Sequence, residues 1–170
     1  MHALPNALMA RLAHHAQQTP QRTALSDGEQ TLSYADVIHH VAQRRQRLRD
    51  VNARRVALAL DNGLEWALWD LALMVEACVA VPIPDFFSEQ QRRHLVQQAG
   101  LDSWVGHGGE PYGFQATPDP AIAQRRVDHP PALHEGTTRI TFTSGTSGTP
   151  KGVCLDNAAL LTVTESLAEI

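Results

Sequence analysis

Several features that are common in other proteins are scarce in this sequence. No apolar run reaches the roughly 20 residues that a helical membrane span needs, so we expect no membrane span. The first ten residues lack a basic start followed by a long apolar stretch, so we expect no signal peptide. Cysteine is limited to Cys78 and Cys154, each in an apolar context, and we interpret both as reduced, buried thiols of a cytoplasmic protein.

Basic residues are fewer than acidic ones, and lysine is almost absent. Fourteen Lys and Arg residues stand against eighteen Asp and Glu, a net charge of −4 that argues against a general nucleic-acid binder. Thirteen of the fourteen are arginines, and Lys151 is the only lysine. Lysine presents a compact point charge on a flexible stem, whereas arginine presents a planar fork. The single lysine therefore indicates a geometric demand at its position.

Nine histidines raise the question of a metal site. His14 and His15 are adjacent, as are His39 and His40, and neighbouring residues on a helix point in different directions. No H-x-x-x-H or H-E-x-x-H spacing occurs, and no cysteine lies near either pair. We therefore predict no metal site built by the protein itself.

The order of expected elements predicts an α/β fold. The pattern β-α-β-α-β from Val56 to Val105 is typical of a mostly parallel sheet covered by helices. A turn at Asp27-Gly28 predicts a hairpin, and residues 106–136 form a long connection with room for one edge strand. Ser33, Asn62 and Ser88 are expected helix caps. The expected helices are 4–18, 34–49, 64–75, 89–99 and 158–170, and the strands are 56–60, 77–84, 103–105 and one from Ile140.

The segment Arg44 to Arg55 contains six arginines. One interpretation is a site for an anionic partner. The other is a solvated helix end, where cations suit the helix dipole. We favour the solvated helix end, because runs of charge usually mark exposed faces.

A loop rich in small polar residues follows the last expected strand. Ile140 to Gly152 reads I-T-F-T-S-G-T-S-G-T-P-K-G. Its first residues alternate as in a short strand. The residues from Ser144 to Gly152 supply hydroxyl donors, and their glycines allow the backbone to bend sharply. Successive backbone N–H groups in such a loop can form a nest for anions. Lys151 adds a positive charge, so we predict that this loop binds an oxyanion such as phosphate.

Two other interpretations of the loop are weaker. A Ser/Gly/Thr run can be a flexible linker, but here it follows a strand pattern and precedes a helix pattern. The loop does not fit the Walker A motif G-x-x-x-x-G-K-[ST] of P-loop NTPases either, since Pro150 precedes the lysine and Gly152 follows it.

Thr143 to Gly152 resembles the phosphate-binding signature T-S-G-[ST]-[ST]-G-x-P-K-G of the adenylate-forming superfamily at every position. That superfamily contains acyl-CoA synthetases, adenylation domains of nonribosomal peptide synthetases, and luciferases. The resemblance implies that the loop surrounds the phosphates of ATP, with Mg²⁺ carried in by the nucleotide. The implied ATP phosphate-binding residues are Thr143, Ser144, Gly145, Thr146, Ser147, Gly148, Thr149, Lys151 and Gly152.

The resemblance also implies an activity. The family activates a carboxylic acid as an acyl-adenylate, releases pyrophosphate, and commonly passes the acyl group to a thiol of CoA or of phosphopantetheine on a carrier protein. The family's adenine, ribose and catalytic-lysine motifs are not found in these 170 residues, so no catalytic residue is identified. We expect residues 1–170 to be the N-terminal portion of an AMP-binding domain.

Two expectations follow for the isolated chain. It should be inactive in adenylation, and it should associate, for example as a dimer, through the apolar surface that truncation exposes. The alternative function is a non-enzymatic nucleotide-binding or assembly module that keeps only the phosphate loop.

Overall fold

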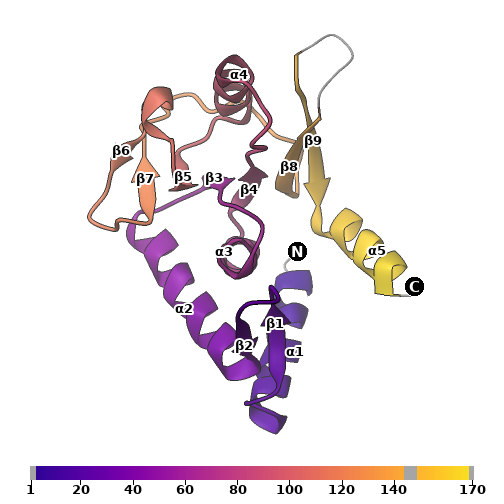
Figure 1. Ribbon diagram of the computed structural model, residues 1–170. Helices are drawn as coiled ribbons and strands as arrows, with labels where there is room; N and C mark the ends of the chain where they lie inside the picture. Colours follow the sequence, from indigo (N-terminus) through magenta and orange to yellow (C-terminus); the bar gives the residue numbers. More distant parts are fainter. Residues whose placement is uncertain (1–2, 144–148, 169–170) are drawn as a thin grey trace. The chain divides into compact units, whose positions relative to one another are not determined.

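The structure is a computed structural model that describes residues 3–143 and 149–168 (Figure 1). The chain divides into two compact units. One comprises Met1–Asn52 and Asp61–Ala77, and the other comprises Ala53–Leu60 and Cys78–Ile170. No helix within the described ranges has both the length and the apolar character that crossing a membrane requires.

The first unit consists of three helices and a hairpin: α1 (Ala3–Gln18), β1 (Thr23–Ser26), β2 (Thr31–Ser33), α2 (Tyr34–Asp50) and α3 (Leu64–Val75). Helix α2 begins at Ser33, the N-cap that the sequence predicts, and Ser33 forms a capping box with Asp36. The Ser33 hydroxyl accepts a hydrogen bond from the Asp36 amide, and the Asp36 carboxylate accepts one from the Ser33 amide. The Ser33 hydroxyl also donates to the Asp36 carboxylate at 2.6 Å, and this bond, followed by that from the Ser33 amide, lowers the pKa of Asp36.

Arg44 and Arg45 of α2 are buried or half-buried and paired, so the interpretation of Arg44 to Arg55 as a solvated helix end is wrong for these two residues, whereas Arg47 and Arg49 are exposed. Arg44 is buried, donates to Glu65 of α3 at 2.6 Å, and lies 5.5 Å over the ring of Trp69. Arg45 and Arg49 both donate to Glu76. The pairs join α2 to α3 and to the residue that follows it, so these charges hold the helices of this unit together.

The second unit is built on a seven-stranded sheet with the order β6-β7-β5-β3-β4-β8-β9. Its centre, β5-β3-β4-β8, is parallel, and the outer strands β7, β6 and β9 add antiparallel pairs. The strands are β3 (Arg55–Ala59), β4 (Val79–Pro82), β5 (Ser103–Gly106), β6 (Gln115–Ala116), β7 (Ile122–Gln124), β8 (Thr137–Thr143) and β9 (Lys151–Asp156). The α/β class with a parallel centre is therefore confirmed.

Helix α4 (Glu89–Ala99) packs its apolar side into the core of the second unit, and a short 3-10 turn, η1 (Glu110–Tyr112), follows β5. Leu95, Val96 and Ala99 are buried in one cluster with Val81 of β4 and Phe142 of β8. The helix begins at a capping box on Ser88, and Gly100 ends it with φ +61°, as the sequence predicts.

Three details of the sequence-based prediction are wrong. Asn62 does not cap α3, whose N-cap is Gly63 and has no side-chain cap. The connection 106–136 holds two short strands rather than one. A strand, β9, separates the polar loop from the last helix, α5 (Asn157–Ala168), so the expected strand–loop–helix context is a strand–loop–strand hairpin.

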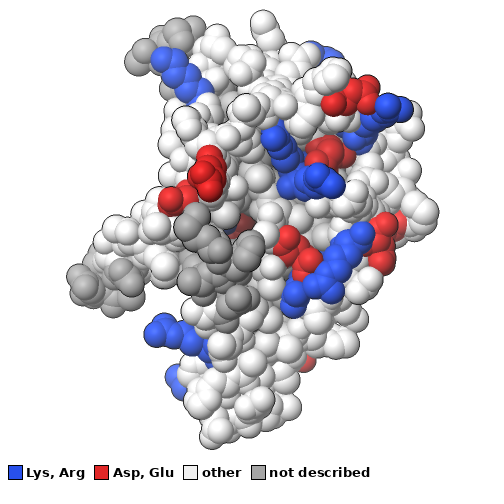
Figure 2. Space-filling view, turned by 180° about the vertical axis from the view of Figure 1, so that it is seen from behind, with Lys and Arg blue, Asp and Glu red and all other residues white. Residues whose placement is uncertain are grey.

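Charge on the face shown in Figure 2 is mixed, with Lys and Arg interspersed among Asp and Glu. Ion pairs of the second unit include Arg93 with Glu89 and Arg126 with Asp128. A nucleic-acid-binding face would instead carry a continuous basic stripe.

Candidate phosphate-binding site

The base of the candidate site is the β8–β9 hairpin. Thr143 is the register partner of Lys151, and Phe142 is the partner of Gly152. Cross-strand partners lie on the same face of a sheet, and successive residues alternate between faces. Thr143 and Lys151 therefore share one face of the hairpin, and Phe142 and Gly152 share the opposite face.

Four of the predicted site residues lie within the described part of the chain. Thr143, Thr149 and Lys151 are exposed, and Lys151 forms no ion pair with any residue that the structure describes. The hairpin thus brings a hydroxyl and an ammonium group together at the two ends of the loop. The other five predicted residues, Ser144, Gly145, Thr146, Ser147 and Gly148, lie outside the described residues.

Gly152 has a packing reason to be glycine. A Cβ atom at this position would lie 3.0 Å from Cζ of Phe142 and 3.0 Å from Cγ2 of Ile140. The Phe142 ring therefore occupies the space that a side chain on β9 would take. This requirement is separate from any contact of Gly152 with phosphate, which stays a prediction.

The candidate site lies at the carboxyl end of the parallel strands. Strand β8 runs parallel to β4, so the segments that follow the two strands leave the same edge of the sheet. Ligands of open α/β sheets bind outside this edge. The geometry therefore places the ends of the polar loop where a ligand of this fold class is expected.

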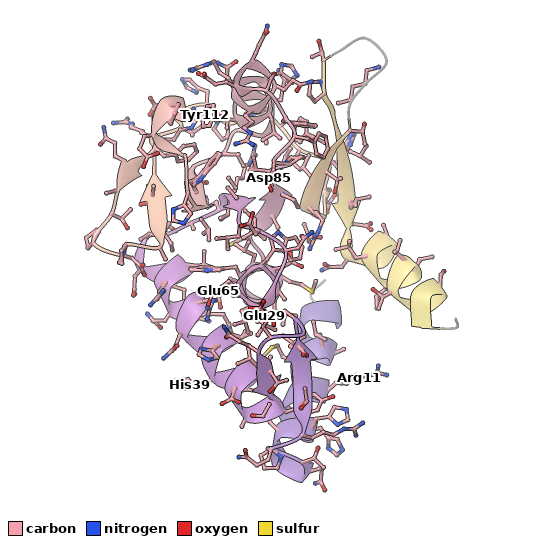
Figure 3. All side chains as sticks on the ribbon, in the orientation of Figure 1. Arg11, Glu29, His39, Glu65, Asp85 and Tyr112 are labelled. Atoms are coloured by element: carbon pink, nitrogen blue, oxygen red, sulfur yellow. The ribbon has the colours of Figure 1, made fainter. Side chains whose placement is uncertain are left out.

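The segment that follows β4, Ile83–Ser88, leaves the same edge of the sheet as the polar loop, and the sequence analysis did not single it out as part of a site. Phe86 is 81% exposed in it, and Asp85, labelled in Figure 3, is also exposed. Arg92 of α4 holds the segment by donating to the backbone oxygens of Asp85 and Phe87. The only feature of the sequence that could have placed this segment at the sheet edge is its position directly after a buried strand.

No protein ligand set for a metal is present in the described ranges. No group of three or more His, Cys, Asp or Glu side chains there is placed to hold an ion. The adjacent histidine pairs each make edge contacts, with ring centroids 5.8 Å apart.

A family model described as "AMP-binding enzyme" matches residues 12–169. Syringomycin synthase SyrB1 of Pseudomonas syringae pv. syringae is 25% identical over 179 residues, which cover 95% of this chain and 28% of that protein. The chain therefore spans little more than a quarter of the length of this relative.

Solved structures share the fold. A fatty acyl-adenylate ligase from L. pneumophila, in complex with acyl adenylate and pyrophosphate, has a TM-score of 0.66 at 20% sequence identity. The matched region covers 97% of this chain and 32% of the ligase. An O-succinylbenzoate Coenzyme A synthetase from Bacillus subtilis, in complex with AMP, has a TM-score of 0.65 at 22% sequence identity. The matched region covers 92% of this chain and 45% of the synthetase. The resemblance drawn from Thr143 to Gly152 is confirmed by the family match, and the chain belongs to the AMP-binding enzyme family.

Proposed function

We propose that the loop from Thr143 to Gly152 binds the phosphates of ATP. The observation that carries this proposal is the register pair of Thr143 and Lys151, which puts an exposed hydroxyl and the chain's only lysine at the two ends of a Ser/Thr/Gly loop. A compact ammonium group suits a phosphate oxygen. The sheet edge where the loop begins suits a ligand of this fold class.

The proposed reaction is the activation of a carboxylic acid. A carboxylate oxygen attacks the α-phosphorus of ATP, the bond from that phosphorus to the bridging oxygen breaks, and pyrophosphate leaves. Lys151 stabilises the negative charge that develops on the departing pyrophosphate, with Mg²⁺ bound to the nucleotide. The fatty acyl-adenylate ligase from L. pneumophila was solved in complex with acyl adenylate and pyrophosphate, which supports this chemistry.

A second step is proposed to transfer the acyl group to a thiol. The thiol attacks the acyl carbon, a thioester forms, and AMP leaves. CoA and the phosphopantetheine of a carrier protein are both suitable acceptors. A Coenzyme A synthetase is one of the structural neighbours, which supports a thiol acceptor without choosing between the two.

Residues 1–170 are proposed to be the N-terminal portion of the AMP-binding domain, and the chain alone is proposed to lack adenylation activity. The test is carboxylate-dependent ATP–pyrophosphate exchange. Purified chain should give no exchange above a blank. A polypeptide that also carries the remaining parts of a ligase should exchange, and Lys151→Ala should lower its kcat by roughly 30- to 1000-fold, the equivalent of about 2–4 kcal/mol.

The alternative is a module that binds nucleotide without chemistry. It predicts that the chain binds ATP but that the longer polypeptide gives no exchange. Wild-type kcat and KM in the Lys151→Ala ligase at saturating magnesium would instead contradict the phosphate-site proposal itself.

The chain is also proposed to associate with a second copy through β9 and α5. Val153, Leu161 and Val163 are exposed there. Antiparallel pairing of two β9 strands would also place Lys151 opposite Asp156 of the second copy. Light scattering should detect dimers at high concentration. A monomer across a wide concentration range would contradict this part of the proposal.

A further inference from the structure

The end of the β8–β9 hairpin that carries the polar loop has few backbone ties to the rest of the sheet. The register of β8 with β4 has a single pair, Ala80 with Arg139. Beyond Arg139, the described residues of β8 have register partners on β9 alone, as far as Thr143 with Lys151. The placement of this end against the second unit therefore depends on side-chain packing rather than on pairing with a third strand.

Phe142 is the side chain that ties this end of the hairpin to the core. It is only 6% exposed and lies in one cluster with Leu95 and Val96 of α4. Its ring also takes the space beside Gly152, where a Cβ atom would lie 3.0 Å from Cζ and 3.2 Å from Cε1 of the ring. The ring therefore packs directly behind the residue that follows Lys151.

The residue that precedes Lys151 is anchored on the same side. Pro150 is buried, and with Phe142 and Gly152 it lines a cavity of about 400 Å³ whose other wall includes His94 of α4. Figure 1 shows the hairpin beside this helix. Lys151 borders the cavity as well, so the cavity is the space behind the base of the phosphate loop. Because this space is open, a shorter side chain at position 142 would let the end of the hairpin move toward α4.

We propose that Phe142 is a positioning residue for Lys151. Its buried ring holds the end of the hairpin so that the ammonium group meets the phosphates without rearrangement. The inference rests on the proposed phosphate site and adds to it a residue that touches no ligand. A displacement of about 1 Å caused by a remote substitution can cost roughly 100-fold in rate, and close-packed interiors transmit such displacements. Loss of the ring should therefore weaken the binding of phosphates.

The test is calorimetric titration of magnesium pyrophosphate into the 170-residue chain with Phe142→Leu, which should bind roughly 5- to 20-fold more weakly than wild type. The matched control is Phe114→Leu, the same change at a ring that is 2% exposed in the same core cluster and does not line the cavity. The control should stay within about 1.5-fold of wild type. Unchanged affinity in Phe142→Leu, or equal weakening by the two variants, would overturn the proposal.

Urea titrations establish that each variant is folded under the conditions of the binding experiment. If Phe142→Leu does not fold, Phe142→Met takes its place, because methionine keeps more of the length of the lost ring and adapts to irregular space. Phe142→Met should weaken pyrophosphate at least about threefold, and its control Phe114→Met should stay within about 1.5-fold of wild type. Wild-type affinity in Phe142→Met would then contradict the proposal.

A double-mutant cycle tests whether the ring acts through the lysine. In a chain that already carries Lys151→Ala, adding Phe142→Leu should change the affinity for pyrophosphate by less than about twofold, because the group that the ring positions is gone. A further loss of about fivefold or more would show that the ring acts on another part of the loop, which would contradict the assignment.

The failure of this inference is separable from failure of the phosphate site. Wild-type affinity in Lys151→Ala alone would contradict the phosphate site. A loss in Lys151→Ala with no loss in Phe142→Leu would leave the phosphate site standing and remove only the role of Phe142.

Discussion

The arginines of α2 in the first unit and Lys151 in the second unit use positive charge in opposite ways. In the first unit, Arg44, Arg45 and Arg49 are each bonded to a carboxylate of the same unit. In the second unit, Lys151 is exposed at the base of the polar loop and forms no ion pair with a described residue. A paired cation stabilises the fold, whereas an unpaired one remains available to a ligand. The comparison teaches that the paired arginines of α2 are structural, whereas Lys151 is free to meet a ligand, the role proposed for it.

The largest effect on stability is expected from Arg44→Ala in the first unit. The substitution removes the bond to Glu65 and the packing of the arginine over Trp69, with Arg44 only 7% exposed. We expect the free energy of unfolding to fall by about 2–4 kcal/mol in urea titrations. Arg44→Met, which keeps the apolar stem, should cost less than half of that.

The exposed Arg22→Ala serves as the control for Arg44 and should change the free energy of unfolding by no more than about 0.5 kcal/mol. If Arg44→Ala behaves like this control, the arginines of α2 are not structural and the comparison fails.

Gly152→Ala sharpens the comparison, because it tests whether packing rather than charge holds the hairpin. The added methyl would meet Phe142 and Ile140 at 3.0 Å, while the backbone of Gly152 is not in the left-handed region. We expect a loss of about 1–3 kcal/mol in the free energy of unfolding. Phe142→Leu should relieve part of it, so that the double variant is more stable than the sum of the two changes implies. Strict additivity would show that the ring and the glycine are not coupled.

The pH dependence of stability in Glu76→Gln tests the pairing of Glu76 with Arg45 and Arg49. Burial raises the pKa of Glu76, but hydrogen bonds from Arg49 and Arg45 outweigh it and hold the pKa below its ordinary value of 4.5. A depressed carboxyl pKa stabilises the fold above the unfolded value and ceases to do so as pH falls through the folded value. The variant should therefore be less stable by about 1–2 kcal/mol at pH 7, and the difference should shrink as pH falls below 4.5.

Glu29→Gln, at an exposed carboxylate labelled in Figure 3, is the control for Glu76 and should show no such pH-dependent difference. A Glu76→Gln penalty that stays constant between neutral and acidic pH would contradict the role assigned to this pair.

The smallest effect on stability is expected from Lys151→Ala. The side chain is exposed at the base of the loop, so thermal unfolding should shift by the equivalent of no more than about 0.5 kcal/mol. A large drop in melting temperature that Lys151→Arg restores would identify the lysine as one more structural cation and erase the contrast between the units.

Local signals predicted much of the fold. Helix α4 was predictable at both ends, because Ser88 and Gly100 carry the cap signals in adjacent residues. The central parallel strands were predictable from apolar runs such as the one in β3, whose Val56, Ala57 and Leu58 are all buried.

What the sequence could not supply was pairing at a distance. Strand β9 contains glycine and charged ends, and it is defined by its antiparallel register with β8 rather than by its own pattern. Glu65 and Glu76 lie 21 to 31 residues from the arginines that they bind, so no local window links them. The cavity beside the hairpin has the same origin, since it joins residues of α4, a connection and two strands.

The central claim is that Lys151 binds phosphate, and the most direct test is calorimetric titration of magnesium pyrophosphate into the 170-residue chain. Lys151→Ala should weaken binding by roughly 10- to 100-fold, the loss expected for one charge-assisted contact. Lys151→Arg should recover only part of the affinity. Arg126→Ala, which removes the same charge from an exposed position outside the site, should stay within about twofold of wild type. Wild-type affinity in Lys151→Ala would contradict the account.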